Sequence, residues 1–382
     1  MSKPIPYNRP YMVGTELERI AEAHRNGVLA GNGSFTRRCE SWLEARTGCR
    51  SALMVHSCTA ALEMAAILAG FNPGDEVIMP SFTFVSTANA FVLRGGIPVF
   101  VDIRPDTLNL NEDLVEAAIT PRTRAIVAVH YAGVGCEMRR LLDIAQRHGL
   151  LLIEDAAQGL MSAWRNQPLG GIGDLAAVSF HETKNIISGE GGALLVNRPD
   201  MVARARVIRD KGTNRDSFFR GEVDKYTWMD IGSSYLPGEV IAAFLSAQMD
   251  QAQSITARRI ALWQTYHQAF ENLENAGLLR RPVIPPDCVH NGHIYYLLLP
   301  TPAIRDYFLD HCRRQEVGAV FHYLPLHRAP AGLRYGRAFG DLPVTDRVAA
   351  TLIRLPLFID LSADDQQRVV DTVEQGLMGA PH

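Results

Sequence analysis

The sequence predicts an α/β fold with a mostly parallel sheet, followed by a smaller α+β C-terminal part. Short apolar runs alternate with helical patterns from about residue 50 to residue 200. The runs are almost continuously apolar, which is typical of parallel strands that are buried on both faces. Helical patterns separate them, so helices are expected to cover both faces of the sheet.

Seven strands are predicted in this region, at residues 52–56, 76–79, 99–102, 125–130, 150–154, 175–180 and 193–196. Five helices are predicted between or after them, at residues 59–68, 82–94, 111–118, 139–148 and 198–210. The segment 211–236 mixes charged and aromatic residues without a clear period, and we expect a long ordered loop there. A kinked helix at 239–273 then leads to the C-terminal part, where strands are expected at 294–299 and 317–322 and helices at 303–315 and 364–377.

The composition is that of an ordinary globular protein. The 382 residues are 47% hydrophobic and 21% charged, enough for a sizeable core and two domains. A net charge of −3 argues against a broad nucleic-acid-binding surface. No apolar stretch approaches the roughly 18 residues of a membrane span, and the first residues lack the apolar core of a secretory signal. The six cysteines form no C-x-x-C pair, so the expected location is the reducing cytoplasm.

A lysine and an aspartate each lie at or just beyond the carboxyl end of a predicted buried strand. Lys184 ends a Ser-Phe-His-Glu-Thr-Lys run, and Asp155 follows the strand at 150–154. Ligands of open α/β sheets collect at this edge. Pyridoxal phosphate needs such a pair, because its aldehyde forms a Schiff base with an amine and its ring nitrogen needs a carboxylate that keeps it protonated. The pair therefore predicts an enzyme that moves amino groups.

Hydroxyl and small residues mark a second part of this edge. Ser57, Cys58 and Thr59 stand where the first strand turns into a helix. The start of a helix binds phosphate through its free amides and its dipole. A plain helix cap explains these residues equally well when they are taken alone. Ser179, close to Lys184, could add a further hydroxyl to the same phosphate.

Aromatic and polar residues complete the candidate cofactor site. Phe84 could stack on a flat heteroaromatic ring, although packing in the core is the simpler explanation for a single phenylalanine. Asp155 could equally cap the helix that follows its strand, and Gln158, one turn later, carries no signal by itself.

Metal and dinucleotide sites are not expected. The spacing of Cys288, His290 and His293 fits no common zinc pattern. His181-Glu182 is not an H-E-x-x-H motif, because Asn185 stands where the second histidine would be. The glycine-rich run at 170–173 precedes a strand, whereas the dinucleotide fingerprint follows one.

A locally basic stretch has two interpretations that the sequence leaves open. It is either a solvated helix face with loop charges or an anion site for a diphosphate, which arginine forks suit. Its members are Arg204, Arg206, Arg209, Lys211, Arg215, Arg220 and Lys225. We take Arg215 and Arg220 as the candidates for substrate binding.

Together these motifs resemble the DegT/DnrJ/EryC1/StrS family, the sugar-nucleotide aminotransferases of fold type I, over essentially the whole chain. The resemblance is carried by the runs at 74–78, 80–89, 101–102, 154–158 and 189–192. Further runs at 180–185, 211–215, 224–228, 230–235 and 320–327 resemble a subgroup that acts on C4 of a dTDP-linked sugar.

The resemblance implies a fold and a role for each matching residue. It implies a large pyridoxal-phosphate domain with an N-terminal arm at residues 1–248, and a bridging helix with a small domain at 249–382. Lys184 would hold the cofactor, Asp155 would pair with the pyridine nitrogen, Gln158 would contact the ring hydroxyl side, and Phe84 would stack on the ring. Cys58, Thr59 and Ser179, beside Ser57, would hold the phosphate. Ser234 replaces an asparagine that reaches the phosphate from a partner subunit in relatives, and His327 matches a histidine near the substrate.

The implied reaction is amino transfer from L-glutamate to C4 of dTDP-4-keto-6-deoxy-D-glucose, by a homodimer with shared active sites. The galactose-configured 4-amino product would serve cell-surface polysaccharide synthesis. A 3-keto sugar, a UDP sugar or a glucose-configured product is the nearest alternative. Dehydrases of the same fold carry histidine in place of the lysine, so Lys184 argues against that chemistry. A cofactor-binding regulator would carry an added DNA-binding module, of which the sequence shows no sign.

Overall fold

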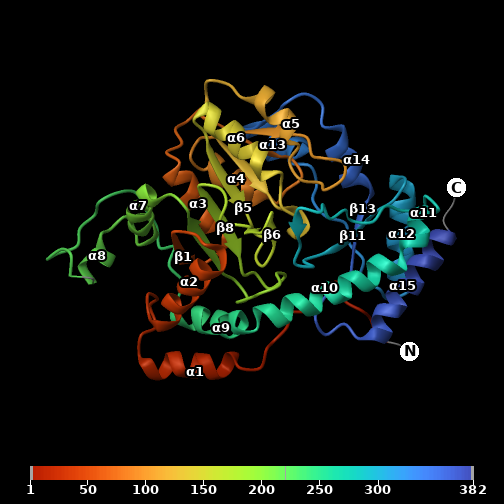
Figure 1. Ribbon diagram of the computed structural model, residues 1–382, viewed down its shortest axis with the longest axis horizontal. Coiled ribbons are helices and arrows are strands. Elements are labelled where there is room, and N and C mark those ends of the chain that lie inside the picture. Colours follow the sequence, from red (N-terminus) through yellow and green to blue (C-terminus); the bar gives the residue numbers. More distant parts are fainter. Residues whose placement is uncertain (1–2, 220, 380–382) are drawn as a thin grey trace.

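The computed structural model describes residues 3–219 and 221–379, and an eight-stranded sheet forms its centre (Figure 1). In spatial order its strands are β1 (Ser51–Val55), β9 (Gly192–Val196), β8 (Leu175–Ser179), β5 (Leu151–Asp155), β4 (Thr123–Val129), β2 (Glu76–Pro80), β3 (Ile97–Val101) and β12 (Arg337–Ala338). Within the described residues, β9 alone runs antiparallel to its neighbours. The predicted α/β fold with a mostly parallel sheet is confirmed, but the predicted number of seven strands was wrong. The eighth strand, β12, is a two-residue segment of the C-terminal part that pairs with β3.

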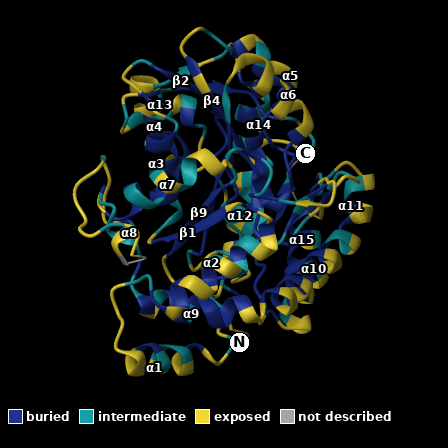
Figure 2. Cartoon of the chain, turned by 60° about the vertical axis from the view of Figure 1, so that its left-hand side comes forward, coloured by how far each residue is buried: buried dark blue, intermediate teal, exposed yellow. Residues whose placement is uncertain are grey.

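Helices cover both faces of this sheet, as predicted. One face carries α3 (Cys58–Leu68), α4 (Val85–Val92) and α7 (Pro199–Arg209). The other carries α2 (Ser34–Thr47), α6 (Met138–His148) and α9 (Glu239–Asp250). Strands β1, β2, β8 and β9 are buried along their whole length (Figure 2). Burial on both faces is the reason that their sequences are nearly all apolar and were recognisable.

The connection between the two parts of the chain differs in detail from the prediction. The segment 211–236 contains a short helix, α8 (Arg215–Phe219), and projects from the body at the left of Figure 1. The predicted helix at 239–273 is kinked into α9, α10 (Ala252–Ala269) and α11 (Glu271–Asn275). The breaks fall at Gln251 and Phe270, whose backbones leave the helical region.

The C-terminal part is built on a two-stranded antiparallel sheet of β11 (Tyr295–Leu298) and β13 (Leu352–Leu355). Helices α10, α12 (Pro302–Arg314) and α15 (Ala363–Met378) pack against it around a separate core. The strand predicted at 317–322 was wrong. Val317 makes a single bridge to Ile5 and Val320 makes one to Arg354, so the segment is divided between two partners and forms no continuous ladder.

The N-terminal arm, residues 3–9, lies along this C-terminal part. The amide of Ile5 donates to the Glu316 carbonyl at 2.9 Å, and the amide of Gly318 donates to the Ile5 carbonyl at 2.8 Å. A Cβ on Gly318 would meet the backbone nitrogen of Tyr7 at 2.5 Å, so the close contact of the arm depends on glycine here.

The remaining elements are short or were not predicted. They are α1 (Glu16–Asn26), α5 (Glu112–Val115), α13 (Pro330–Tyr335), α14 (Pro343–Thr351), the strands β6 (Ala163–Trp164), β7 (Gln167–Pro168) and β10 (Cys288–Val289), and the 3-10 helices Glu116–Ala118, Tyr131–Gly133 and Leu326–Arg328. Over residues 3–219 and 221–379, no helix combines the length and the apolar character needed to cross a membrane. The domain boundary between residues 248 and 249 stays a prediction.

Candidate active site

A cavity of about 570 Å³ opens at the carboxyl ends of the central strands. Its walls come from the ends of β5 and β8, the first turns of α3 and α4, the N-terminal arm and the C-terminal part. Eight of the predicted cofactor residues line it: Ser57, Cys58, Thr59, Phe84, Asp155, Gln158, Ser179 and Lys184. The structure thus brings together residues that lie up to 127 positions apart in the chain.

Lys184 enters the cavity from a tight turn that follows β8. The amide of Lys184 donates to the His181 carbonyl at 2.8 Å, and the amide of Ser188 returns to the Phe180 carbonyl at 2.7 Å. Withdrawal of the amine from water lowers the pKa of Lys184, although the nearby Cys58 and Asp155 act in the opposite direction. The neutral, nucleophilic amine is therefore more abundant than on an exposed lysine.

Asp155, at the end of β5, is held in one orientation by a chain of hydroxyl groups. The Thr87 hydroxyl donates to Asp155 Oδ2 at 2.7 Å. Because that proton is committed, the Thr83 hydroxyl must donate to Thr87 Oγ1, at 2.8 Å. The amide of Ala157 donates to Asp155 Oδ1 at 3.2 Å. Thr83 and Thr87 belong to the run at 80–89. Their spacing of one helical turn was the only sign in the sequence that their hydroxyls could lie together and orient Asp155.

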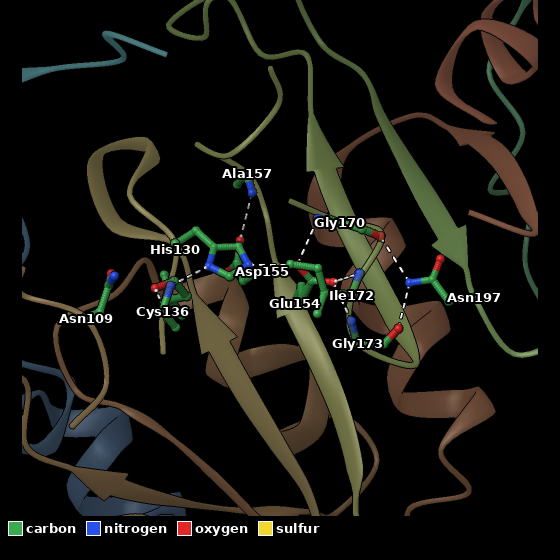
Figure 3. A network of polar contacts seen from close by, with 12 residues as sticks. Asn109, His130, Cys136, Glu154, Asp155, Ala157, Gly170, Ile172, Gly173 and Asn197 are labelled. Atoms are coloured by element: carbon green, nitrogen blue, oxygen red, sulfur yellow. Dashed lines mark hydrogen bonds and ion pairs between the residues drawn. The ribbon is translucent and has the colours of Figure 1, made fainter. Parts of the chain in front are cut away.

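Glu154, the neighbour of Asp155, fixes the strand end from the opposite face of the sheet (Figure 3). Its carboxylate accepts from His130 Nε2 at 2.9 Å and from the amides of Gly170, Ile172 and Gly173 at 2.6–2.8 Å. Burial raises the pKa of Glu154, but the hydrogen bonds from His130 and from these amides outweigh it, so the net pKa is lowered. The carboxylate thus stays charged and ties β5 to the loop at 170–173.

Gln158 joins the sheet to the C-terminal part. Its Oε1 accepts from the amide of Ala132 at 2.7 Å, and its Nε2 donates to the Tyr323 hydroxyl at 2.8 Å. The Tyr323 ring lies 6.4 Å from that of Phe84 and stacks on that of His322 at 3.7 Å, measured between ring centres. Phe84 stands at the N-cap of α4 and is 57% exposed, so it is not a core residue. A flat ring could stack on it from the cavity.

The sequence left open whether the start of α3 is a plain helix cap or a phosphate site, and the structure is compatible with both functions. The Ser57 hydroxyl oxygen accepts from the amide of Ala60 at 3.1 Å, which is an ordinary N-cap. The Thr59 and Ser86 hydroxyls lie 2.7 Å apart and both line the cavity. A Cβ on Gly192 would meet the amide nitrogen of Cys58 at 2.5 Å, so β9 packs directly against this turn. The cap shapes the turn and leaves hydroxyls and a helix N-terminus for an anion.

The C-terminal part and the N-terminal arm together add a wall of residues that the sequence did not predict: Tyr7, Arg259, His293, His322 and Arg354. They escaped notice because each comes from a different segment, and because β13, which carries Arg354, was not recognised.

His293 has a fixed tautomer in this wall. The Asn185 amide nitrogen donates to the Asn291 carbonyl at 2.9 Å, so its oxygen must accept from His293 Nδ1 at 3.0 Å. Burial first, and then the charge of Lys184, lowers the pKa of His293 well below its usual value. Cys288 belongs to β10, and the His290 ring packs against Trp263 at 4.5 Å. In the part of the chain that the structure describes, no three His, Cys, Asp or Glu side chains are placed to hold a metal ion.

Of the other predicted residues, Ser234, His327 and Arg215 do not line the cavity. Ser234 is exposed and forms a single bridge with Asp210. His327 Nδ1 lies 2.7 Å from Ser81 Oγ, and Nε2 lies 3.4 Å from Asp346. Arg215 begins α8, and Arg220 falls outside the described residues. Of the basic stretch, Arg204 pairs with Asp230 at 2.7 Å and Arg209 pairs with Glu40, so these two are used inside the chain.

The residues that line the cavity fit pyridoxal phosphate. An amine with a lowered pKa, an oriented carboxylate, an exposed phenyl face and a helix N-terminus flanked by hydroxyl groups face one space. These are the groups that an aldehyde, a pyridinium, an aromatic ring and a phosphate each need.

Comparison with known proteins leads to the same chemistry. The model of the DegT/DnrJ/EryC1/StrS aminotransferase family matches residues 10–374. The chain is 32% identical over 390 residues to the spore coat polysaccharide biosynthesis protein SpsC of Bacillus subtilis, covering 98% of both chains. It is 30% identical to the aminotransferase TlmJ from Streptoalloteichus hindustanus, with a TM-score of 0.89 over 98% of this chain and 99% of TlmJ. It is 29% identical to DesV of S. venezuelae, solved in complex with a ketimine intermediate, with a TM-score of 0.90 and both chains fully covered.

Proposed function

Because this chain belongs to the DegT/DnrJ/EryC1/StrS aminotransferase family, we propose that it transfers an amino group from L-glutamate to a 4-keto sugar carried on dTDP. The class of the enzyme is not in doubt: it is a pyridoxal-phosphate-dependent sugar aminotransferase, and the predictions of this class and of this cofactor are confirmed. The observation that carries the proposal is the Lys184 amine and the Asp155 carboxylate facing one cavity at the edge of the sheet.

The roles proposed for the cavity residues are those that the family resemblance implies, and the contacts in the cavity support them. Lys184 would hold the cofactor covalently, and Asp155, oriented by Thr87, would pair with the protonated ring nitrogen. Gln158, which donates to Tyr323, would contact the hydroxyl side of the ring, and Phe84 would stack on its face. Ser57, Cys58, Thr59 and Ser179, at and beside the start of α3, would bind the phosphate.

In the reaction, pyridoxal phosphate supplies a protonated aromatic ring that withdraws electrons from the carbon next to the transferred nitrogen. Lys184 Nζ takes the proton from the α-carbon of L-glutamate and, in the second half of the reaction, returns a proton to C4 of the sugar. The lowered pKa of Lys184 favours the neutral base that the first step requires. Thr87 and the amide of Ala157 keep the side chain of Asp155 in one orientation toward the ring nitrogen that it would pair with.

The proposed substrate is dTDP-4-keto-6-deoxy-D-glucose, and the proposed product is dTDP-4-amino-4,6-dideoxy-D-galactose for cell-surface polysaccharide synthesis. The runs at 180–185, 211–215 and 320–327 support this choice. The similarity to a spore coat polysaccharide biosynthesis protein agrees with a role in polysaccharide synthesis. A UDP sugar, a 3-keto sugar or a glucose-configured product is the competing proposal. We also propose that the enzyme works in the cytoplasm.

The test is to incubate the enzyme with L-glutamate and dTDP-4-keto-6-deoxy-D-glucose and to identify the product by mass spectrometry and NMR. An axial amine at C4 supports the galactose configuration, and an equatorial amine replaces it with the glucose configuration. No amination of this substrate, together with amination of a UDP or 3-keto sugar, would move the proposal to that sugar. Lys184→Ala is the control and should produce no aminated sugar.

We further propose that the enzyme is a homodimer in which Ser234 of one subunit reaches the phosphate site of the other. Ser234 is exposed and lies outside its own cavity, and it follows a segment after α8 that is largely exposed (Figure 2). Tyr226, Trp228 and Met229 are 53%, 78% and 60% exposed. Apolar surface of this kind, gathered on one projecting segment, is typical of an interface between subunits.

A further inference from the structure

Two arginines line the cavity without an acidic partner. Arg354, on β13, donates from Nε and Nη2 to the same acceptor, the Phe321 carbonyl, at 3.2 and 2.9 Å. Arg259, on α10, donates to the carbonyls of Gly292, His293 and Leu357. Among the described residues, no carboxylate lies within ion-pair distance of either guanidinium. Their positive charges therefore face the cavity uncompensated.

The buried Arg259 keeps its positive charge. Arg259 is 4% exposed, and burial lowers its pKa to about 10, so it is still protonated at neutral pH. The acids that line the cavity are Asp155 and Glu190. Asp155 is bound by Thr87 and Ala157, and Glu190 lies on the rim beside His181, with Oε1 3.7 Å from the imidazole. A buried cation without a counter-charge destabilises the fold, and an anion bound at this wall of the cavity would relieve that cost.

Arg354 is also held in place for a partner. Its guanidinium lies over the Tyr7 ring, 4.7 Å from the ring centre, and the Phe321 carbonyl takes one edge of the fork. Tyr7 is fixed in turn because the N-terminal arm is bonded to residues 316–318. The neighbouring His322 is neutral, because burial lowers its pKa well below its usual value. The guanidinium of Arg354 is thus held in a defined orientation at the wall of the cavity.

We propose that the guanidinium of Arg354, with the charge of Arg259 behind it, binds a carboxylate of the amino donor. This inference rests on the proposed function, and it names the part of the cavity that the donor uses. Arginine forks match carboxylates in geometry and charge. Arg354 and Lys184 line the same cavity, so the two groups can act on one amino acid. A second positive charge favours a dicarboxylic donor such as L-glutamate over a neutral amino acid.

The test uses the holoenzyme and the donor half-reaction alone. L-Glutamate is mixed with enzyme in the absence of any sugar, the change in cofactor absorbance is followed, and binding of the unreactive dicarboxylate succinate is measured by calorimetry. Arg354→Gln should weaken the apparent affinity for both by about 10- to 100-fold, the range for loss of a charge-assisted hydrogen bond. Arg354→Lys keeps the charge but loses the forked guanidinium, so its affinity for both ligands should lie between that of the wild type and that of Arg354→Gln. Arg258→Gln is the matched control, because Arg258 contacts only the carbonyls of Ile359 and Leu361 outside the cavity.

An unchanged affinity for L-glutamate and succinate in Arg354→Gln, with normal cofactor loading, overturns the proposal. Loss confined to sugar-nucleotide binding overturns it as well and assigns Arg354 to the diphosphate. If Arg354→Gln does not fold, Arg354→Lys and Tyr7→Leu decide, since both should weaken donor binding and unchanged values in both refute the proposal. Failure to aminate any dTDP sugar would contradict the proposed substrate but not the proposed role of Arg354, because the donor half-reaction and succinate binding are measured without a sugar.

Discussion

Lys184 is placed where its chemistry requires it, at a cost to stability. Burial lowers its pKa because the charged amine is deprived of water. In the unfolded chain the same amine has its ordinary pKa and binds a proton more readily. The difference destabilises the cofactor-free fold at pH values below the lowered pKa, and it disappears as the pH rises toward the ordinary value near 10.4.

Lys184→Met should therefore make the cofactor-free protein more stable at pH 7 than the wild type. The advantage should shrink as the pH rises toward the ordinary pKa of about 10.4, because the wild-type lysine becomes easier to bury as it loses its proton. Urea unfolding of both proteins at pH 7, 8 and 9 measures this. An advantage that does not change with pH would mean that the substitution acts through packing instead.

The role of a single residue could be predicted from the sequence where the residue lies within a local motif. Lys184 and Asp155 stand at strand ends within runs that resemble one family, so their roles could be predicted. Thr87, His293 and Arg354 could not be predicted, because their importance depends on contacts with residues 68, 108 and 33 positions away. No local pattern records such contacts. His327 matched a motif, yet its side chain contacts Ser81 outside the cavity.

Among the secondary-structure elements, β5 is held from two sides at its carboxyl end. Asp155 faces the cavity, whereas Glu154 accepts four hydrogen bonds on the other face of the sheet. His130 presents Nε2–H to Glu154, since its Nδ1 accepts from the Cys136 amide at 3.2 Å. The loop at 170–173 and the turn after β4 are thereby fixed relative to the strand that carries Asp155.

Glu154→Gln should destabilise the protein by about 2–4 kcal/mol, because an amide NH2 group would face N–H donors inside the sheet. The wild-type contribution should be lost on acidification, since a lowered pKa means that the stabilisation is present above about pH 4.5 and disappears as the pH falls through the folded value. Urea unfolding at pH 7 measures the first effect. Glu18→Gln, an exposed position on α1, is the control and should change stability by less than about 0.5 kcal/mol.

The contact between β9 and α3 has no space for a side chain. Gly192→Ala would place a methyl carbon 2.5 Å from the Cys58 amide nitrogen, so the first turn of α3 must move. We expect a loss of about 1–3 kcal/mol in cofactor binding, the usual range for overpacking, measured by titrating pyridoxal phosphate into the cofactor-free enzyme. Gly191→Ala, whose methyl carbon would meet the Ser188 hydroxyl, is the comparison. Equal affinities of both variants for pyridoxal phosphate would mean that the first turn of α3 does not contribute to phosphate binding.

Elements buried on both faces were predictable, and elements defined by a distant partner were not. The strands β1, β8 and β9 are nearly all apolar and lie within a few residues of their predicted positions. The segment 317–322 is similar in composition to a strand, but its bridges go to Ile5 and Arg354, at opposite ends of the chain. The short strand β12 contains no pattern of its own and exists because it meets β3.

For the whole molecule, the proposed dimer with shared sites has a quantitative consequence. Lys184→Ala and Ser234→Trp should each inactivate a homodimer. A mixed dimer regains one intact site, because one chain supplies Lys184 and the other supplies Ser234. Random mixing at equal amounts should restore about a quarter of the wild-type activity. If Ser234 served its own chain, every site in the mixture would carry one defect, and no activity would return. Size-exclusion chromatography with light scattering should confirm that the two variants exchange subunits.

The N-terminal arm makes the active site depend on two distant parts of the chain. Tyr7 and Asn8 line the same cavity as Arg354, and the arm is held there by the hydrogen bonds of Ile5 with residues 316 and 318. Detachment of the arm would therefore open one wall of the active site and leave the central sheet in place, because the strands of that sheet all lie between residues 51 and 338.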